Sequence, residues 1–199
     1  MPSMLEMLTG QLGGDAIGRI SREIGADETS TKAAAGGALS TMIAALARNA
    51  SQGDGAESLH KALSKDHDGG LLDNLSGFLG QAQSGPGDGI LRHVLGNNRP
   101  RVEAGLAKSS GLDAGSMGKL MTMLAPVVMG ALGKQQRQGK MDSKDLAGFL
   151  GQQQQEIQRQ QPQAAGVLGR LLDTDNDGDV DLGDLAKSGA GLLGKLFRG

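Results

Sequence analysis

The amino-acid sequence predicts an all-α fold, and three observations lead to this expectation. Apolar residues recur every three or four positions along the longest segments, which is the spacing that keeps them on one face of a helix. Alternation of apolar and polar residues, typical of a half-buried strand, is nowhere sustained. The chain has 3 Phe and neither Trp nor Tyr, so its core must be aliphatic and rich in methionine, with small residues that let helices approach closely.

Composition narrows the classes of function. The formal net charge of -2 gives no electrostatic reason to expect nucleic acid as a partner, and the shortage of aromatic residues leaves almost no stacking platforms for bases. Because cysteine is absent, there is no disulfide, no thiolate metal site and no cysteine nucleophile. The opening stretch MPSMLEMLTGQLGGDAIGRI carries Glu6 and interrupting glycines, which is not typical of a signal peptide.

The chain contains an internal repeat. Residues 20–50 align with residues 106–136, and after a one-residue insertion ESLHKAL aligns with KDLAGFL. The two units span about 15–64 and 102–151. Each predicts a short helix, a glycine-containing turn, a long helix and a third short helix, so we expect two similar helical units packed together.

The start of each long helix is marked by an aspartate. Asp27 follows Gly25 in the first unit, and Asp113 follows Gly111 in the second. An aspartate side chain at such a position accepts hydrogen bonds from the free backbone N–H groups of the first turn, so both are expected N-caps. Apolar residues then recur at helical spacing in both units: Met42, Ile43 and Leu46, and Met121, Leu124, Val128 and Leu132.

Between the units, LLDNLSGFLG and DGILRHVLG predict short helices, separated by QAQSGPG and followed by NNRP. The longest apolar stretch of the chain, LMTMLAPVVMGAL, lies in the second long helix. At about 13 residues it is shorter than the roughly 20 that a bilayer-spanning helix needs, and Pro126 lies inside it. We therefore expect a buried core helix.

We expect three parts along the chain: a helical body over residues 1–151, a Gln-rich linker over 152–163 and a C-terminal appendix over 164–199. The segment QQQQEIQRQQPQ holds no apolar stripe and is closed by Pro162. It is therefore interpreted as an exposed helix end that runs into a flexible linker.

The appendix contains DTDNDGDVDLGD, residues 173–184, which is a candidate EF-hand loop. An EF-hand binds its cation through loop positions one, three, five, seven, nine and twelve, and it needs Gly at position six. Gly178 falls at position six, and Asp179 at position seven would contribute its backbone carbonyl. The predicted metal ligands are Asp173, Asp175, Asp177, Asp179, Asp181 and Asp184.

The last ligand bears on which cation binds. Asp184 stands where Glu is commoner, and a side chain one methylene shorter that binds through one oxygen weakens Ca²⁺ relative to Mg²⁺. Ca²⁺ is the expected cofactor and Mg²⁺ the alternative. The other interpretation is an acidic, solvated loop that only resembles a metal site.

A second acidic stretch, SKDHDGGLLDNL, follows the same pattern less closely. It carries Asp66, Asp68 and Asp73, but it is one residue short and lacks the first ligand. We interpret these aspartates as turn and cap residues, with a second cation site as the alternative. His60 and His67 would need a third ligand at fixed spacing to form a transition-metal site, and the sequence does not supply one.

Signatures of catalysis are missing from the sequence. There is no G-x-S-x-G elbow, no P-loop and no G-x-G-x-x-G fingerprint. The 3 His lack Ser or carboxylate partners at a useful spacing. We therefore expect a protein that is not an enzyme.

Several motifs carry a family resemblance, in order along residues 1–151: QLGG, ALARNA, DHDGGLLDNLSGFLG, DGILRHVLG, SSGLDAG and LAPVVMGALGK. Together they resemble the bacterial domain-of-unknown-function family DUF937, to which the YidB-like proteins are related. The resemblance implies a small helical protein of the bacterial cytoplasm, without assigned catalysis. Proteins similar to this one often end in an acidic loop and a Gly/Leu/Phe tail. The acidic loop also resembles half of a dockerin, which uses two such loops.

These features favour a cation-binding helical protein that acts through a protein partner or through self-association. The alternative is a peripheral membrane or envelope-associated protein that uses the tail SGAGLLGKLFRG. On a helix, the tail's leucines and Phe197 gather towards one side, with Lys187, Lys195 and Arg198 elsewhere. The sequence leaves three interactions open for the tail: packing as the second helix of the EF-hand-like pair, self-association, or membrane contact.

Overall fold

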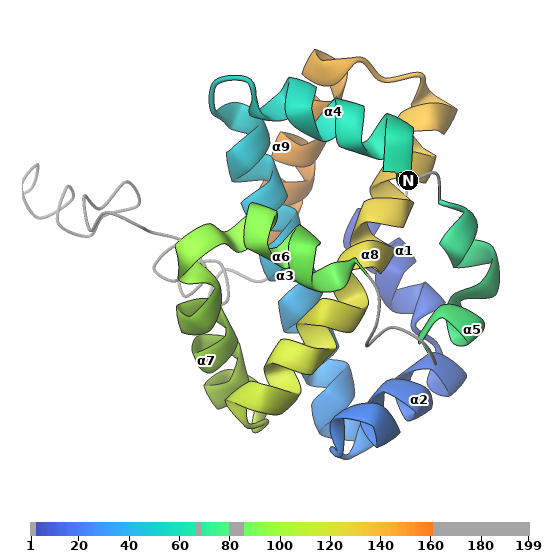
Figure 1. The fold of residues 1–199 in the computed structure, drawn as a ribbon, viewed down its shortest axis with the longest axis vertical. Helices are drawn as coiled ribbons and strands as arrows, with labels where there is room; N and C mark the ends of the chain where they lie inside the picture. The colour runs from blue at the N-terminus through green and yellow to red at the C-terminus, as the bar shows by residue number, and fades with distance from the viewer. Residues whose placement is uncertain (1–2, 67–68, 80–85, 161–199) are drawn as a thin grey trace, which may run out of the picture.

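Helices make up the regular structure of the residues that the computed structural model describes, which are 3–66, 69–79 and 86–160 (Figure 1). These residues contain no strand. The prediction of an all-α fold is therefore confirmed. The acidic loop and the tail lie outside the described residues.

Two long helices cross the centre of the body, and the shorter helices surround them (Figure 1). The α-helices are, in chain order, α1 (Met4–Gln11), α2 (Gly14–Ile24), α3 (Glu28–Ser51), α4 (Gly55–Asp66), α5 (Leu75–Leu79), α6 (Gly87–Leu95), α7 (Arg99–Ser110), α8 (Ala114–Gly139) and α9 (Ser143–Gln160). Among the described residues, the 3-10 helices η1 (Gly70–Asn74) and η3 (Gly96–Asn98) lead directly into α5 and α7.

The longest helix, α8, is the predicted core helix. It is the one helix in the described part of the chain that is long and apolar enough to cross a membrane by length and composition, yet 67% of its apolar window is buried inside the body. Leu120, Leu124 and Leu132 have no exposed surface. The expectation of a buried core helix is confirmed.

The glycines and aspartates that precede the two long helices form matching caps. Gly25 ends α2 and Gly111 ends α7, each in the left-handed conformation, with φ of 72° and 76°. Asp27 and Asp113 then accept hydrogen bonds from the backbone N–H three residues later, at 2.9 and 3.0 Å. Both aspartates are therefore N-caps, as the sequence predicts.

The two long helices and the helices around them share one core. α7 packs on both α3 and α8, and α9 packs on α3. Polar contacts also join helices that are distant in the sequence, because the Ser116 hydroxyl at the start of α8 donates to the carbonyl of Ile24 in α2 at 2.9 Å. Neither long helix has a core of its own.

The Gln-rich segment corrects the expected domain boundary. α9 continues to Gln160, so residues 152–160 belong to a helix of the body and the expectation of a linker is wrong for them. Ile157 is only 3% exposed, and the Gln153 side-chain oxygen accepts a hydrogen bond from the Met4 backbone N–H at 2.7 Å. One apolar residue in register with the core face, together with half-buried glutamines, is enough to seat the last turns of the helix.

A proline inside α8 shapes its contact with α6. Pro126 has no backbone N–H, so the carbonyl of Thr122 loses its usual helical partner. Gly87, the first residue of α6, lies directly against this carbonyl, and a Cβ at Gly87 would overlap the Thr122 oxygen. The close approach of α6 to α8 therefore requires a residue without a side chain.

Candidate functional site

The predicted metal ligands all lie outside the described residues: Asp173, Asp175, Asp177, Asp179, Asp181 and Asp184. Within the part of the chain that the structure describes, no group of three or more His, Asp or Glu side chains could hold a metal ion. A cation site in the described body would therefore need ligands of another kind.

Two aspartates of the second acidic stretch lie in different elements of the described residues. Asp66 is the last residue of α4, and Asp73 is an exposed residue of η1 whose carboxylate lies 4.0 Å from the Lys134 ammonium. The His60 ring lies against the backbone between α8 and α9, where its Nε2 is 3.1 Å from the carbonyl oxygen of Met141. His67 and Asp68 lie outside the described residues.

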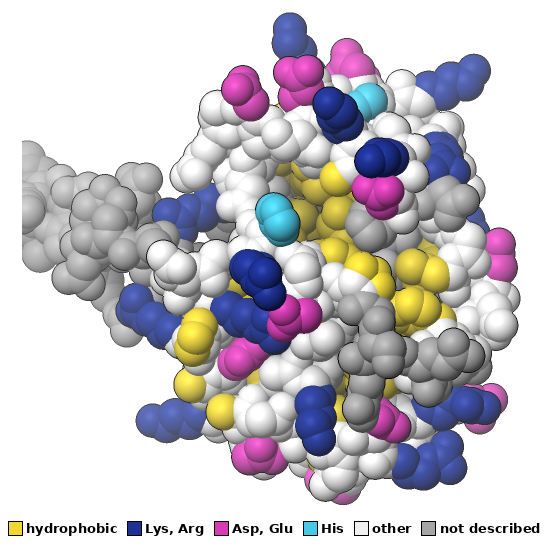
Figure 2. Space-filling view, in the orientation of Figure 1, with side chains coloured by type: hydrophobic (Ala, Val, Ile, Leu, Met, Phe, Trp, Pro, Cys, Tyr) yellow, Lys and Arg dark blue, Asp and Glu magenta, His cyan; other side chains and the backbone are white. Residues whose placement is uncertain are grey.

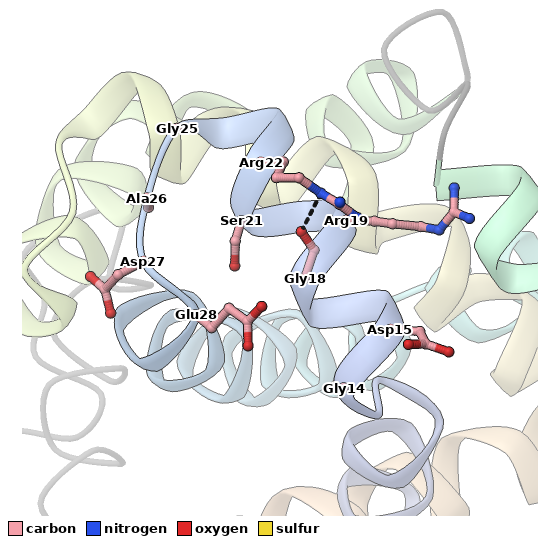
Figure 3. Close-up of a pocket in the computed structure, with 10 residues that line it drawn as sticks. All are labelled: Gly14, Asp15, Gly18, Arg19, Ser21, Arg22, Gly25, Ala26, Asp27 and Glu28. Carbon is pink, nitrogen blue, oxygen red and sulfur yellow. Dashed lines mark hydrogen bonds between the residues drawn. The ribbon is translucent and has the colours of Figure 1, made fainter.

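A groove of about 700 Å³ runs along α2 and the first turn of α3 (Figure 3). Glycines, a serine and an alanine line the groove together with two arginines and three acidic residues. The lining residues are Gly14, Asp15, Gly18, Arg19, Ser21, Arg22, Gly25, Ala26, Asp27 and Glu28.

The charged side chains of this groove do not converge on one point. Glu28 lies over Gly18, whereas Arg19 and Asp15 extend away from it (Figure 3). Arg22 folds back on its own helix and donates from Nε to the Gly18 carbonyl at 3.1 Å. The groove therefore lacks the paired acid and base, or the ring of ligands, that catalysis or metal binding needs.

A cluster of ion pairs joins α6, α7 and α8. Arg99 donates from Nε to Glu103 at 2.7 Å and from a terminal nitrogen to Asp88 at 2.5 Å, and Arg92 reaches the same Asp88 at 2.8 Å. The pKa of Asp88 lies below its usual value because Arg99, and then Arg92, donate hydrogen bonds to its ionised form. Arg99 also donates a hydrogen bond to the Thr122 hydroxyl at 3.4 Å, so the cluster holds the start of α6 near Pro126 of α8.

A buried amide lies at the junction of α4 with the end of α8. Gln136 is 4% exposed, and its Nε2 donates to the Ser64 hydroxyl at 3.2 Å and to the His60 carbonyl at 3.4 Å. Its Oε1 is buried without a hydrogen-bond partner among the described residues. Sequence reasoning missed this residue, because one glutamine in a run of them carries no signal of burial.

The shifted acidic pKa values among the described residues have structural causes. Asp27 and Asp113 have pKa values below 3.8 because the serine three residues later donates hydrogen bonds to each. The pKa of Asp142 is lowered chiefly by the backbone N–H of Asp145, at the start of α9. These carboxylates cap helices, and Asp88 joins an ion-pair cluster.

The two long-helix caps lead to a prediction about pH. Because their folded-state pKa is lowered, they stabilise the fold above the unfolded-state pKa of 3.8, and this stabilisation is lost as pH falls through the folded-state values. The free energy of unfolding should therefore fall between about pH 5 and about pH 3. In the variant Asp27→Asn/Asp113→Asn the fall should be smaller, because Asn caps a helix as well as Asp does but does not titrate.

Urea denaturation at the two pH values measures this difference. Asp15→Asn, an exposed substitution on α2, is the control and should follow the parent protein. The same loss of stability in the parent and in the double variant would show that other groups control the response to acid.

Comparison with known proteins gives one finding at the level of a family. A family model described as "Bacterial protein of unknown function (DUF937)" matches residues 6–135. This range covers more than half of the chain and extends from α1 into α8. No curated protein and no solved structure matches the chain.

Proposed function

Because this chain belongs to the DUF937 family of bacterial proteins of unknown function, we propose that it is a cytoplasmic, non-enzymatic protein that binds a divalent cation. The cation is Ca²⁺, with Mg²⁺ as the alternative, and residues 173–184 bind it. The protein acts through contacts with a protein partner or with a second copy of itself. A closer kinship with the YidB-like proteins is part of the same proposal.

The spacing of the aspartates is the observation that carries this proposal. Carboxylates fall at the EF-hand ligand positions, and Gly178 falls where the loop must turn sharply. Six ionised side chains within residues 173–184 repel one another at neutral pH. A divalent cation removes this repulsion and replaces it with attraction at short range.

The lowered pKa values of the described body have structural explanations. A carboxylate with a shifted pKa in a cleft is a usual indication of an active site. Here the lowered pKa values belong to caps and an ion pair: Asp27, Asp113 and Asp142 cap helices, and Asp88 pairs with arginine. The fold accounts for each of them, so none requires a catalytic role.

Calorimetric titration of the full chain with CaCl₂ and MgCl₂ tests the proposal. We expect Ca²⁺ to bind at millimolar concentration or below, and Asp173→Ala/Asp175→Ala to abolish the binding because it removes two ligands. Asp15→Ala/Asp54→Ala is the matched control, because it removes the same charge from exposed positions of the body and should leave the binding unchanged. The absence of binding by either cation at millimolar concentration would refute the cation site.

A further inference from the structure

The surface of the body is hollowed between α4 and α6, and apolar side chains show inside the hollow (Figure 2). These two helices carry apolar residues that are only half-buried against the core: Ala56 and Leu59 on α4, and Ile90 and Val94 on α6. A helix face of this kind gains stability when a further apolar surface covers it. The hollow is therefore suited to an apolar segment.

One residue of α3 contacts both α6 and the start of α4. The Asn49 side chain donates to the Val94 carbonyl near the end of α6 at 3.0 Å. The start of α4 lies against the same residue, because a Cβ at Gly55 would overlap the Asn49 carbonyl oxygen. The end of α6 and the start of α4 therefore both lie against Asn49.

We propose that the hollow between α4 and α6 is the docking site for the chain's own residues 185–197. This segment supplies large apolar side chains that can cover the half-buried ones of the hollow, and they are Leu185, Leu192, Leu193, Leu196 and Phe197. Its glycines weaken a helix that stands alone, so the segment needs a partner surface in order to fold. The inference goes beyond the proposed function and does not rest on cation binding.

The length of the connection makes this docking favourable. Residues 161–184 lie between the end of α9 and the segment. About 24 extended residues span roughly 80 Å, whereas a body of about 160 residues has a radius of gyration near 15 Å. Any point on the surface is therefore within reach. Tethering also gives the segment an effective concentration of about millimolar, so that even weak apolar contacts are populated.

Disulfide trapping tests this directly, because the chain has no cysteine of its own. In full-length Val94→Cys/Phe197→Cys, mild oxidation should close an intramolecular disulfide, since docking brings the two Cα atoms within the roughly 7 Å that a disulfide requires. The matched control is Ala104→Cys/Phe197→Cys, because Ala104 is exposed on α7, away from the hollow. We expect the first disulfide to form at least tenfold faster.

Three results would overturn the proposal. Equal rates in the two double-cysteine chains would show that residues 185–197 have no preferred site on the body. Disulfides between two chains, detected as doubled mass on a non-reducing gel, would assign the hollow to a second copy. Sedimentation of the full chain with vesicles of phosphatidylcholine and phosphatidylglycerol, lost in Leu193→Asp/Phe197→Asp, would assign the tail to membranes.

Two further measurements keep the test decisive. If Val94→Cys lowers the melting temperature, Leu59→Cys/Phe197→Cys tests the same docking from the opposite wall of the hollow. Running the oxidation both in chelator and in CaCl₂ separates this inference from the proposed function. Fast trapping in chelator, together with no Ca²⁺ binding in the calorimeter, would support the docking and refute the cation site.

Discussion

Replacing Ile157 by alanine should lower the free energy of unfolding by about 2–5 kcal/mol. Ile157 is 3% exposed and belongs to the core, so the substitution removes apolar contacts and leaves a cavity beneath α9. Alanine is at least as good a helix former as isoleucine, so the loss reports packing and not helix propensity. Urea denaturation of the full chain, followed by circular dichroism, measures it.

The neighbouring residue provides the control. Gln158 is exposed on the same turn of α9, so Gln158→Ala should change the free energy of unfolding by no more than about 0.5 kcal/mol. Equally small effects at both positions would mean that residues 152–160 are peripheral to the body. The domain boundary expected at residue 151 would then be the better description.

The features that the sequence predicted well are those with a local cause. A glycine that ends a helix and an aspartate that caps the next one act within a few residues, so Gly25, Asp27, Gly111 and Asp113 could be interpreted without knowledge of the fold. The all-α class follows for the same reason, because helical spacing of apolar residues is a local pattern. The core position of α8 follows from its unusually long apolar run.

The Gln-rich segment shows where local patterns fail. In QQQQEIQRQ only Ile157 is apolar, and a single residue establishes no period. Contacts with distant parts of the chain hold this segment in place. α9 packs on α3, and the Gln153 side chain accepts a hydrogen bond from the backbone of Met4. Such contacts depend on how distant segments meet, and composition alone predicted a linker instead.

The candidate sites also divide into those with a local signal in the sequence and those that depend on distant contacts. The aspartates of residues 173–184 were found from ligand spacing, which is a local signal with a chemical reason. The buried amide of Gln136 and the ion pairs of Arg99 depend on the meeting of helices that are distant in sequence. The hollow between α4 and α6 likewise exists only in the folded body.

Because of the contact between α6 and α8, we expect two glycine-to-alanine substitutions in α6 to change the free energy of unfolding in opposite directions. Gly87→Ala should lower the free energy of unfolding by about 1–3 kcal/mol, the usual cost of overpacking a close contact. The added methyl group would overlap the carbonyl oxygen of Thr122. This carbonyl belongs to the helix backbone next to Pro126, so it cannot swing aside as the end of a side chain would. Either α6 moves away from α8 or the contact is strained.

Gly89→Ala tests whether the effect comes from this contact. Gly89 lies two residues further along α6, and a Cβ there would meet nothing within 4 Å. Alanine lowers the entropy of the unfolded chain and favours a helix, so Gly89→Ala should raise the free energy of unfolding by about 0.5–1 kcal/mol. Thermal and urea denaturation of the two variants should therefore move in opposite directions from the parent protein. Stabilisation by both substitutions would mean that Gly87 of α6 does not lie against the Thr122 carbonyl of α8, and would contradict the close packing of these two helices.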